Sequence, residues 1–328
     1  MDRQNQFAGE AVRKLREAVV SNANVYIYGA AGFGKTSAVE RVLDRDSAAW
    51  ISLNDTEGHA LQALRACDAS RYVVLDDVQC VKSTLLQRQI VQMAGKEGYR
   101  MVMIGRATLP SWLSALRLQS GVLVIPEEEL RATEGELTAY CASAGLKLSR
   151  ERIRTWLALT GGNAMVLEYL VRQLQQGAQD GPALEASIRR TFMSYLDEEV
   201  VGQWSRDVQT FLMQVSVVDA FTLEMAESIT GDDGSALLLS RAERVGNLFS
   251  STGEEWRIRP VLLETMRERA MREFGRRRVN RLLYNAGRYL ESGGQTMQAL
   301  AVYEQCGERD SILSILVREA RKHAGVGQ

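Results

Sequence analysis

The sequence contains few of the residues on which many catalytic and metal sites depend. Its two histidines, His59 and His323, lie far apart, which gives little support to a histidine metal site or a Ser-His-Asp hydrolase. No apolar run approaches the length of a membrane span, no signal peptide opens the chain, and a net charge of −1 gives no global attraction to DNA or membranes. The four cysteines lack C-x-x-C spacing, which argues against a zinc site or a disulfide framework; they are Cys67, Cys80, Cys141 and Cys306. We therefore expect a cytoplasmic protein with no membrane partner.

The segment GAAGFGKT (29–36) matches the phosphate-binding pattern G-x-x-x-x-G-K-[ST]. A short apolar run (25–28) precedes it and a helical pattern (36–43) follows it. The glycines let the backbone wrap around an anion, and the N-terminal end of the following helix favours negative charge. We expect Lys35 to reach the β- and γ-phosphates and Thr36 to bind Mg²⁺. The predicted nucleotide-binding residues here are Gly29, Ala31, Gly32, Phe33, Gly34, Lys35, Thr36 and Ser37.

A second motif, YVVLDD (72–77), is an apolar strand pattern that ends in two carboxylates. Mg²⁺ prefers oxygen ligands, so a carboxylate at a strand end beside a phosphate loop suits it. Successive strand residues point to opposite faces, which gives the two carboxylates different roles. We predict that Asp76 belongs to the metal shell. Asp77 either acts catalytically, by orienting or deprotonating a water, or caps the next helix.

Two further segments carry candidate site residues. In MVMIGR (101–106), Arg106 follows a core strand, where it either senses the γ-phosphate as a catalytic residue or is a solvated loop charge. In GGN (161–163), the segment either brings backbone close to the nucleotide or only caps the helix that Asn163 precedes.

The pattern of apolar residues predicts an α/β P-loop NTPase domain over residues 1–126, with a parallel five-stranded sheet. Short runs at 25–28, 49–53, 72–76, 101–105 and 122–125 are nearly all apolar, as in strands buried on both faces. A helical lid domain follows at 127–180, where Thr133 and Glu136 form a capping box and Ser149 is a second N-cap.

The rest of the chain is mainly helical in pattern. Helices at 185–199, 206–217, 222–229 and 235–245 precede a hairpin with a turn at 251–253, which predicts a winged-helix domain over 181–259. From Pro260 onward we predict a helical arm, 260–328, with the start of a helical-repeat region.

Together these segments resemble the STAND-class P-loop NTPases, and most closely the MalT-type branch, the large ATP-binding regulators of the LuxR family. The similarity covers most of the chain. It is carried by GAAGFGKTS (29–37), VVLDDVQ (73–79), MIGRATLPSWLSALR (103–117), ELRATEGELTAYCASAGLKLS (129–149), LALTGGNAMVLEYL (157–170), FLMQVSVVDAFTLEMAESITG (211–231), RIRPVLLETMRERA (257–270) and QALAVYEQCGERDSILSIL (298–316).

The resemblance implies a switch driven by ATP and ADP, with slow hydrolysis at most. ADP would lock the nucleotide domain against the winged helix, while ATP and a small-molecule or protein inducer would release it for self-association. Arg259 stands where the family usually has a histidine that contacts nucleotide phosphate, so we expect Arg259 to take that contact. DNA binding in the family needs a C-terminal LuxR-type domain that this sequence lacks.

Other functions stay open at this stage. Gln79, Asn163 and Glu10 depart from the family's usual histidine, proline and arginine. An AAA-type ATPase motor or loader acting on nucleic acid is the main alternative, although no convincing second-subunit arginine finger stands out. Direct DNA binding through the winged helix is weaker, because its would-be recognition helix is very apolar at 236–239.

Overall fold

The computed structural model describes residues 6–68, 71–119, 121–245 and 249–325. The chain divides into two compact units, one made mainly of Met1–Phe192 and the other of Met193–Glu243 with Leu248–Gln328. In the described ranges, every helix is too short or too polar to span a lipid bilayer. The division into four domains, with limits at residues 126, 180 and 259, stays a prediction.

The first unit is built on the expected five-stranded parallel sheet. Its strands are β1 Asn24–Tyr28, β2 Ala48–Ser52, β3 Tyr72–Asp76, β4 Arg100–Gly105 and β5 Val122–Ile125, in the order β2-β3-β4-β1-β5. Because all five strands are parallel, their carboxyl ends meet at one edge. The loops after β1, β3 and β4 therefore converge there.

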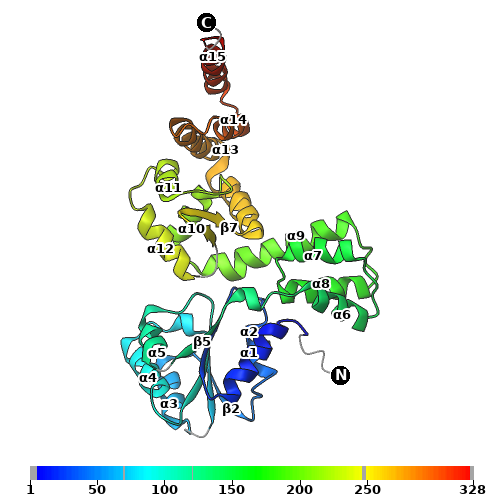
Figure 1. The fold of residues 1–328 in the computed structure, drawn as a ribbon, viewed down its shortest axis with the longest axis vertical. Coiled ribbons are helices and arrows are strands. Elements are labelled where there is room, and N and C mark those ends of the chain that lie inside the picture. The colour runs from blue at the N-terminus through cyan, green and yellow to red at the C-terminus, as the bar shows by residue number, and fades with distance from the viewer. Residues whose placement is uncertain (1–5, 69–70, 120, 246–248, 326–328) are drawn as a thin grey trace. The chain divides into compact units, whose positions relative to one another are not determined.

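Helices cover both faces of this sheet (Figure 1). On one face lie α1 Gly9–Val20 and α2 Lys35–Glu40; on the other lie α3 Glu57–Ala66, α4 Thr84–Ala94 and α5 Ser114–Gln119. The helix expected at 36–43 ends at Glu40, and Val39 O then accepts both from Val42 N–H at 3.0 Å and from Leu43 N–H at 2.8 Å. The apolar spacing of Val39 and Leu43 predicts that both face inward, and both are buried.

Four helices follow the sheet: α6 Glu134–Ser143, α7 Arg150–Thr160, α8 Ala164–Gln175 and α9 Pro182–Tyr195. The capping box is present, since the Thr133 hydroxyl accepts from Glu136 N–H and the Glu136 carboxylate accepts from Thr133 N–H. Ser149 caps α7 through Arg152 N–H, 3.2 Å. The N-cap residues read from the sequence therefore set both helix starts.

The second unit contains the expected winged helix. Its elements are α10 Arg206–Val215, α11 Leu223–Thr230, α12 Ser235–Val245, β6 Phe249–Thr252 and β7 Glu255–Ile258. The two strands form an antiparallel hairpin. Phe221 adds a further backbone pairing on the other side of β7, because it exchanges N–H···O bonds of 3.0 and 2.9 Å with Trp256. The apolar pair Leu248-Phe249 predicts the start of this hairpin, but Leu248 lies outside the described residues.

The helical arm consists of α13 Pro260–Ser292, α14 Thr296–Cys306 and α15 Arg309–Gly325. Gly275 interrupts α13 with a non-helical backbone, φ 71° and ψ 163°, which a glycine adopts without steric cost. A spacing of four residues predicts a packed stripe of Leu262, Met266, Ala270 and Phe274; the first three are buried and Phe274 is half-buried. The arm begins as one helix that packs on α10 and α11 and then pairs with α14.

Candidate functional site

The phosphate loop connects β1 to α2 and has the backbone that its glycines predict. Gly32 and Gly34 have φ of +85° and +72°, in the left-handed region that favours glycine. A side chain on Gly32 would also lie only 2.7 Å from the Asn163 amide. The loop is thus shaped both by its own dihedral angles and by a close neighbour from the helical segment.

Lys35 is the first residue of α2 and is half-buried. Its ammonium group donates to Ala30 O at 2.8 Å, within the loop itself. Burial, with a smaller contribution from the charge of Arg106, lowers the pKa of Lys35 to about 8, although Asp76 and Asp77 oppose the shift. A phosphate oxygen would offer this ammonium a stronger, charge-assisted partner than the carbonyl.

Thr36 and Asp76 meet across the sheet edge. The Thr36 hydroxyl donates to Asp76 Oδ2 at 3.1 Å, and Asp77 N–H donates to Asp76 Oδ1 at 2.8 Å. Burial, followed by the charge of Asp77, raises the pKa of Asp76, while the bonds from Asp77 N–H and Thr36 lower it. The structure therefore brings together the hydroxyl and the carboxylate that the sequence proposed as Mg²⁺ ligands.

Asp77 has a left-handed backbone, φ 62°, and precedes the short 3₁₀ turn Val78–Cys80 without capping it through its side chain. Its carboxylate instead accepts from Gln79 Nε2 at 2.6 Å. The Gln79 amide oxygen in turn accepts from Arg106 N–H at 3.1 Å. Gln79 therefore ties Asp77 to the start of the Arg106 loop. The sequence showed Gln79 only as a replacement for the family's histidine.

Asn163 caps α8 and contacts the phosphate loop at the same time. Its side-chain oxygen accepts from Val166 N–H at 3.2 Å, while its Nδ2 donates to Ala31 O at 3.0 Å. Met165 N–H donates to Gly32 O at 3.0 Å. The segment therefore caps α8, as one alternative expected, and also bonds the phosphate loop, while an approach of its backbone to the nucleotide stays a prediction.

Glu127 is a residue of this region that the sequence did not single out. Its side chain is fully buried and its Oε2 accepts from Ala30 N–H at 2.7 Å. A side chain on Gly29 would lie 2.9 Å from Glu127, so the two residues fit only with a glycine there. The available signal was the position of Glu127 directly after Pro126, at the end of β5.

A cavity of about 270 Å³ lies over the loop. Gly32, Gly34 and Lys35 line it, together with Thr36, Ser37, Met165 and Glu168. Phe33 is buried in the core, so only its backbone is available to a phosphate. The cradle of left-handed glycines, the lysine and the helix N-terminus matches the chemistry of a nucleotide phosphate, and the Thr36–Asp76 pair matches Mg²⁺.

The two predicted arginines of the site, Arg106 and Arg259, lie in different units of the chain. Arg106 follows β4 at the same sheet edge, close enough for its charge to affect the pKa of Lys35. Arg259 belongs to the second unit, where its carbonyl accepts from Leu263 N–H at 2.8 Å as α13 begins. The phosphate contact of Arg259 stays a prediction.

Comparisons with known proteins agree with this architecture. The family model of the MalT winged helix domain matches residues 197–278. A search of curated proteins found no match. The fold is similar to a Walker-type ATPase of Pyrococcus abyssi, with a TM-score of 0.61, 13% identity, and coverage of 79% of this chain and 95% of that one.

Two other solved structures align more loosely. A STAND protein with a tetratricopeptide repeat sensor from Pyrococcus horikoshii aligns with a TM-score of 0.38 and 15% identity, over 96% of this chain and 50% of that one. A RuvB mutant of Thermotoga maritima aligns with a TM-score of 0.45 and 12% identity, over 82% and 95% of the two chains. The family model and the fold shared with the Pyrococcus abyssi ATPase show that the chain combines a P-loop ATPase fold with a MalT-type winged-helix domain.

Proposed function

We propose that this MalT-like P-loop NTPase is a regulatory switch that binds ATP and ADP, hydrolyses ATP slowly and self-associates in its ATP-bound state. The observation that carries the proposal is the double contact between the phosphate loop and α8, through Asn163 to Ala31 O and Met165 to Gly32 O. A ligand that moves this loop must also move or strain α8. The energy of nucleotide binding is thereby available to a conformational change.

Within this proposal, the loop residues hold the phosphates. Lys35 exchanges its bond with Ala30 O for phosphate oxygens, and the loop N–H groups bind the same anion. Thr36 and Asp76 would hold Mg²⁺, which when bound neutralises phosphate charge. Glu127 keeps the entry of the loop in place through Ala30 N–H.

Asp77 is the proposed catalytic residue and Gln79 its positioning residue. The Asp77 carboxylate can orient an attacking water only if the carboxylate itself is held in place. The 2.6 Å hydrogen bond from Gln79 Nε2 holds it. We propose that Arg106 responds to charge at the γ-phosphate position, which is supported by the effect of its charge on the pKa of Lys35. We further propose that Arg259 contacts nucleotide phosphate in the resting state, which an inducer releases.

Sedimentation velocity of the full chain tests the switch. The protein is measured with Mg²⁺ plus ADP, and with Mg²⁺ plus a non-hydrolysable ATP analogue, at several protein concentrations. The proposal expects larger species with the analogue than with ADP, and no difference in Lys35→Ala. Identical distributions in both nucleotides, under conditions where binding is saturated, would contradict nucleotide-dependent assembly.

A further inference from the structure

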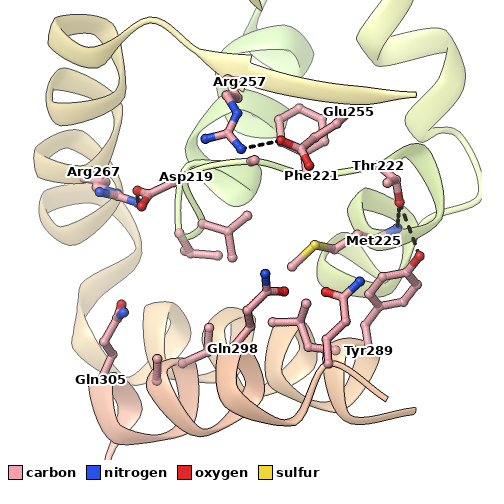
Figure 2. A pocket seen from close by; sticks show the side chains of 17 residues that line it. Asp219, Phe221, Thr222, Met225, Glu255, Arg257, Arg267, Tyr289, Gln298 and Gln305 are labelled. Carbon is pink, nitrogen blue, oxygen red and sulfur yellow. Dashed lines mark hydrogen bonds and ion pairs between the residues drawn. The ribbon is translucent and has the colours of Figure 1, made fainter. Parts of the chain in front are cut away.

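A second cavity lies within the second unit, between the winged helix and the arm (Figure 2). Its volume is about 400 Å³, within the range of roughly 300–1,000 Å³ that is typical of ligand sites. The loop before α11 and the strand β7 form one wall, and α14 forms the other. We call this cavity the arm groove.

In the loop wall, Ala220 has backbone groups that can form hydrogen bonds with a bound chain. Phe221 exchanges both of its backbone bonds with Trp256. In an extended chain the neighbouring residue directs its N–H and C=O to the opposite side, and Ala220, which lines the groove, is that neighbour. In the described part of the chain, the backbone of Ala220 makes no hydrogen bond. Ala220 is therefore an open edge position, with one donor and one acceptor.

The helix wall presents neutral amides. Gln298 and Gln305 are exposed on one face of α14, and Figure 2 shows both side chains extending from that helix towards the groove. Seven residues apart, they are separated by roughly 10 Å along the helix, about the length of three residues of extended chain. Each glutamine amide offers donors and an acceptor, as a peptide unit does. The two amides are therefore spaced to contact one extended segment at points about three residues apart.

The rest of the lining favours an uncharged ligand with apolar side chains. Val218, Met225 and Val302 contribute apolar surface. The charged groups are already paired, Arg267 with Asp219 at 2.7 Å and Arg257 with Glu255 at 2.6 Å. Two positive and two negative groups leave no net charge to attract a phosphate or a nucleic acid.

We propose that the arm groove binds an extended, uncharged peptide segment of a partner protein. The segment adds as a strand at Ala220, its peptide groups on the far side bond Gln298 and Gln305, and its alternate side chains occupy the apolar patch. This site is separate from the nucleotide site, and nothing in the proposed switch assigns it a ligand.

The probe is an array of acetylated and amidated hexapeptides that alternate threonine with valine, leucine or phenylalanine. Binding to the full chain is measured by fluorescence polarisation of labelled peptides, and the best binder is remade with its central peptide nitrogens methylated. Methylation removes backbone donors and keeps every side chain. We expect at least one binder, and at least tenfold weaker binding after methylation.

Two variants locate the site. Gln298→Leu should weaken the best binder about tenfold, while Glu304→Gln, an exposed residue of the same helix outside the groove, should leave the affinity unchanged. In ¹⁵N-alanine-labelled protein, the Ala220 amide signal should shift on binding. The proposal would be overturned if no peptide in the array bound, or if methylation left the affinity unchanged. It would also be overturned if Gln298→Leu left the affinity unchanged and the Ala220 amide signal did not shift on binding.

Discussion

The nucleotide site and the arm groove differ in how their polar groups are engaged. In the nucleotide site, Lys35 bonds Ala30 O, Thr36 bonds Asp76, and Asn163 bonds Ala31 O. In the arm groove, the Ala220 backbone makes no bond in the described ranges, and Gln298 is exposed. A ligand of the first site must exchange existing bonds, whereas a ligand of the second adds new ones. The first arrangement suits a switch, and the second suits a docking site.

The largest effect should come from Asp77, the proposed catalytic residue that Gln79 orients. Asp77→Ala should slow ATP hydrolysis by about 100-fold or more, since a positioned acid or base typically supplies that much, while ATP affinity stays the same. Single-turnover hydrolysis and equilibrium binding of the same preparation measure the two quantities. An unchanged rate would mean that Asp77 is not catalytic and that its hydrogen bond with Gln79 is only structural.

The next effect concerns the lysine. Lys35→Ala should lower the affinity for ADP and ATP by about 50-fold, because it removes charge-assisted hydrogen bonds to phosphate. Lys96→Ala is the matched control, an exposed lysine that precedes β4 at the opposite end of the strand from Arg106. Isothermal titration with ADP compares them. Retained affinity in Lys35→Ala would remove this lysine from the site.

The low pKa of Lys35 gives the site a pH dependence. Phosphate binding needs the ammonium form, and in the free protein that form is lost as the pH rises through about 8. ADP affinity should therefore fall by about tenfold between pH 7 and pH 9. Lys35→Arg keeps its charge over this range, so its affinity should stay level. A wild-type profile as flat as that of Lys35→Arg would contradict the assignment.

The smallest effect tests the link between the loop and α8. Asn163→Ala and Ser149→Ala each remove an N-cap, which costs about 1 kcal/mol of unfolding free energy. Only Asn163 also bonds the phosphate loop. Asn163→Ala should therefore lower the affinity for ADP about fivefold, whereas Ser149→Ala should leave it unchanged. Equal affinities in the two variants would show that Asn163 acts as a cap alone.

Most of the first unit could be predicted because its signals are local. Buried parallel strands are nearly all apolar, so β3 and β5 were located to the residue and the other three strands to within one residue at either end. The glycine pattern of the phosphate loop specifies its own backbone, which places Lys35 at the start of α2. The N-caps Thr133 and Ser149 likewise act over three residues.

The unpredicted features depend on contacts between residues distant in sequence. Glu127 reaches Ala30 over 97 residues, and Asn163 reaches Ala31 over 132. A single buried glutamate or a helix-capping asparagine has no periodicity that would reveal such a partner. The arm groove is harder still, because the Ala220 edge and the Gln298 amide come from segments with no common motif.

The most direct measurement of the central claim is the nucleotide content of the native protein. Freshly purified full chain is denatured, and the released small molecules are separated by chromatography, with Lys35→Ala prepared in parallel. The account predicts near-stoichiometric ADP from the native chain and none from Lys35→Ala. No adenine nucleotide in the native preparation, together with no uptake of added ADP or ATP, would contradict it.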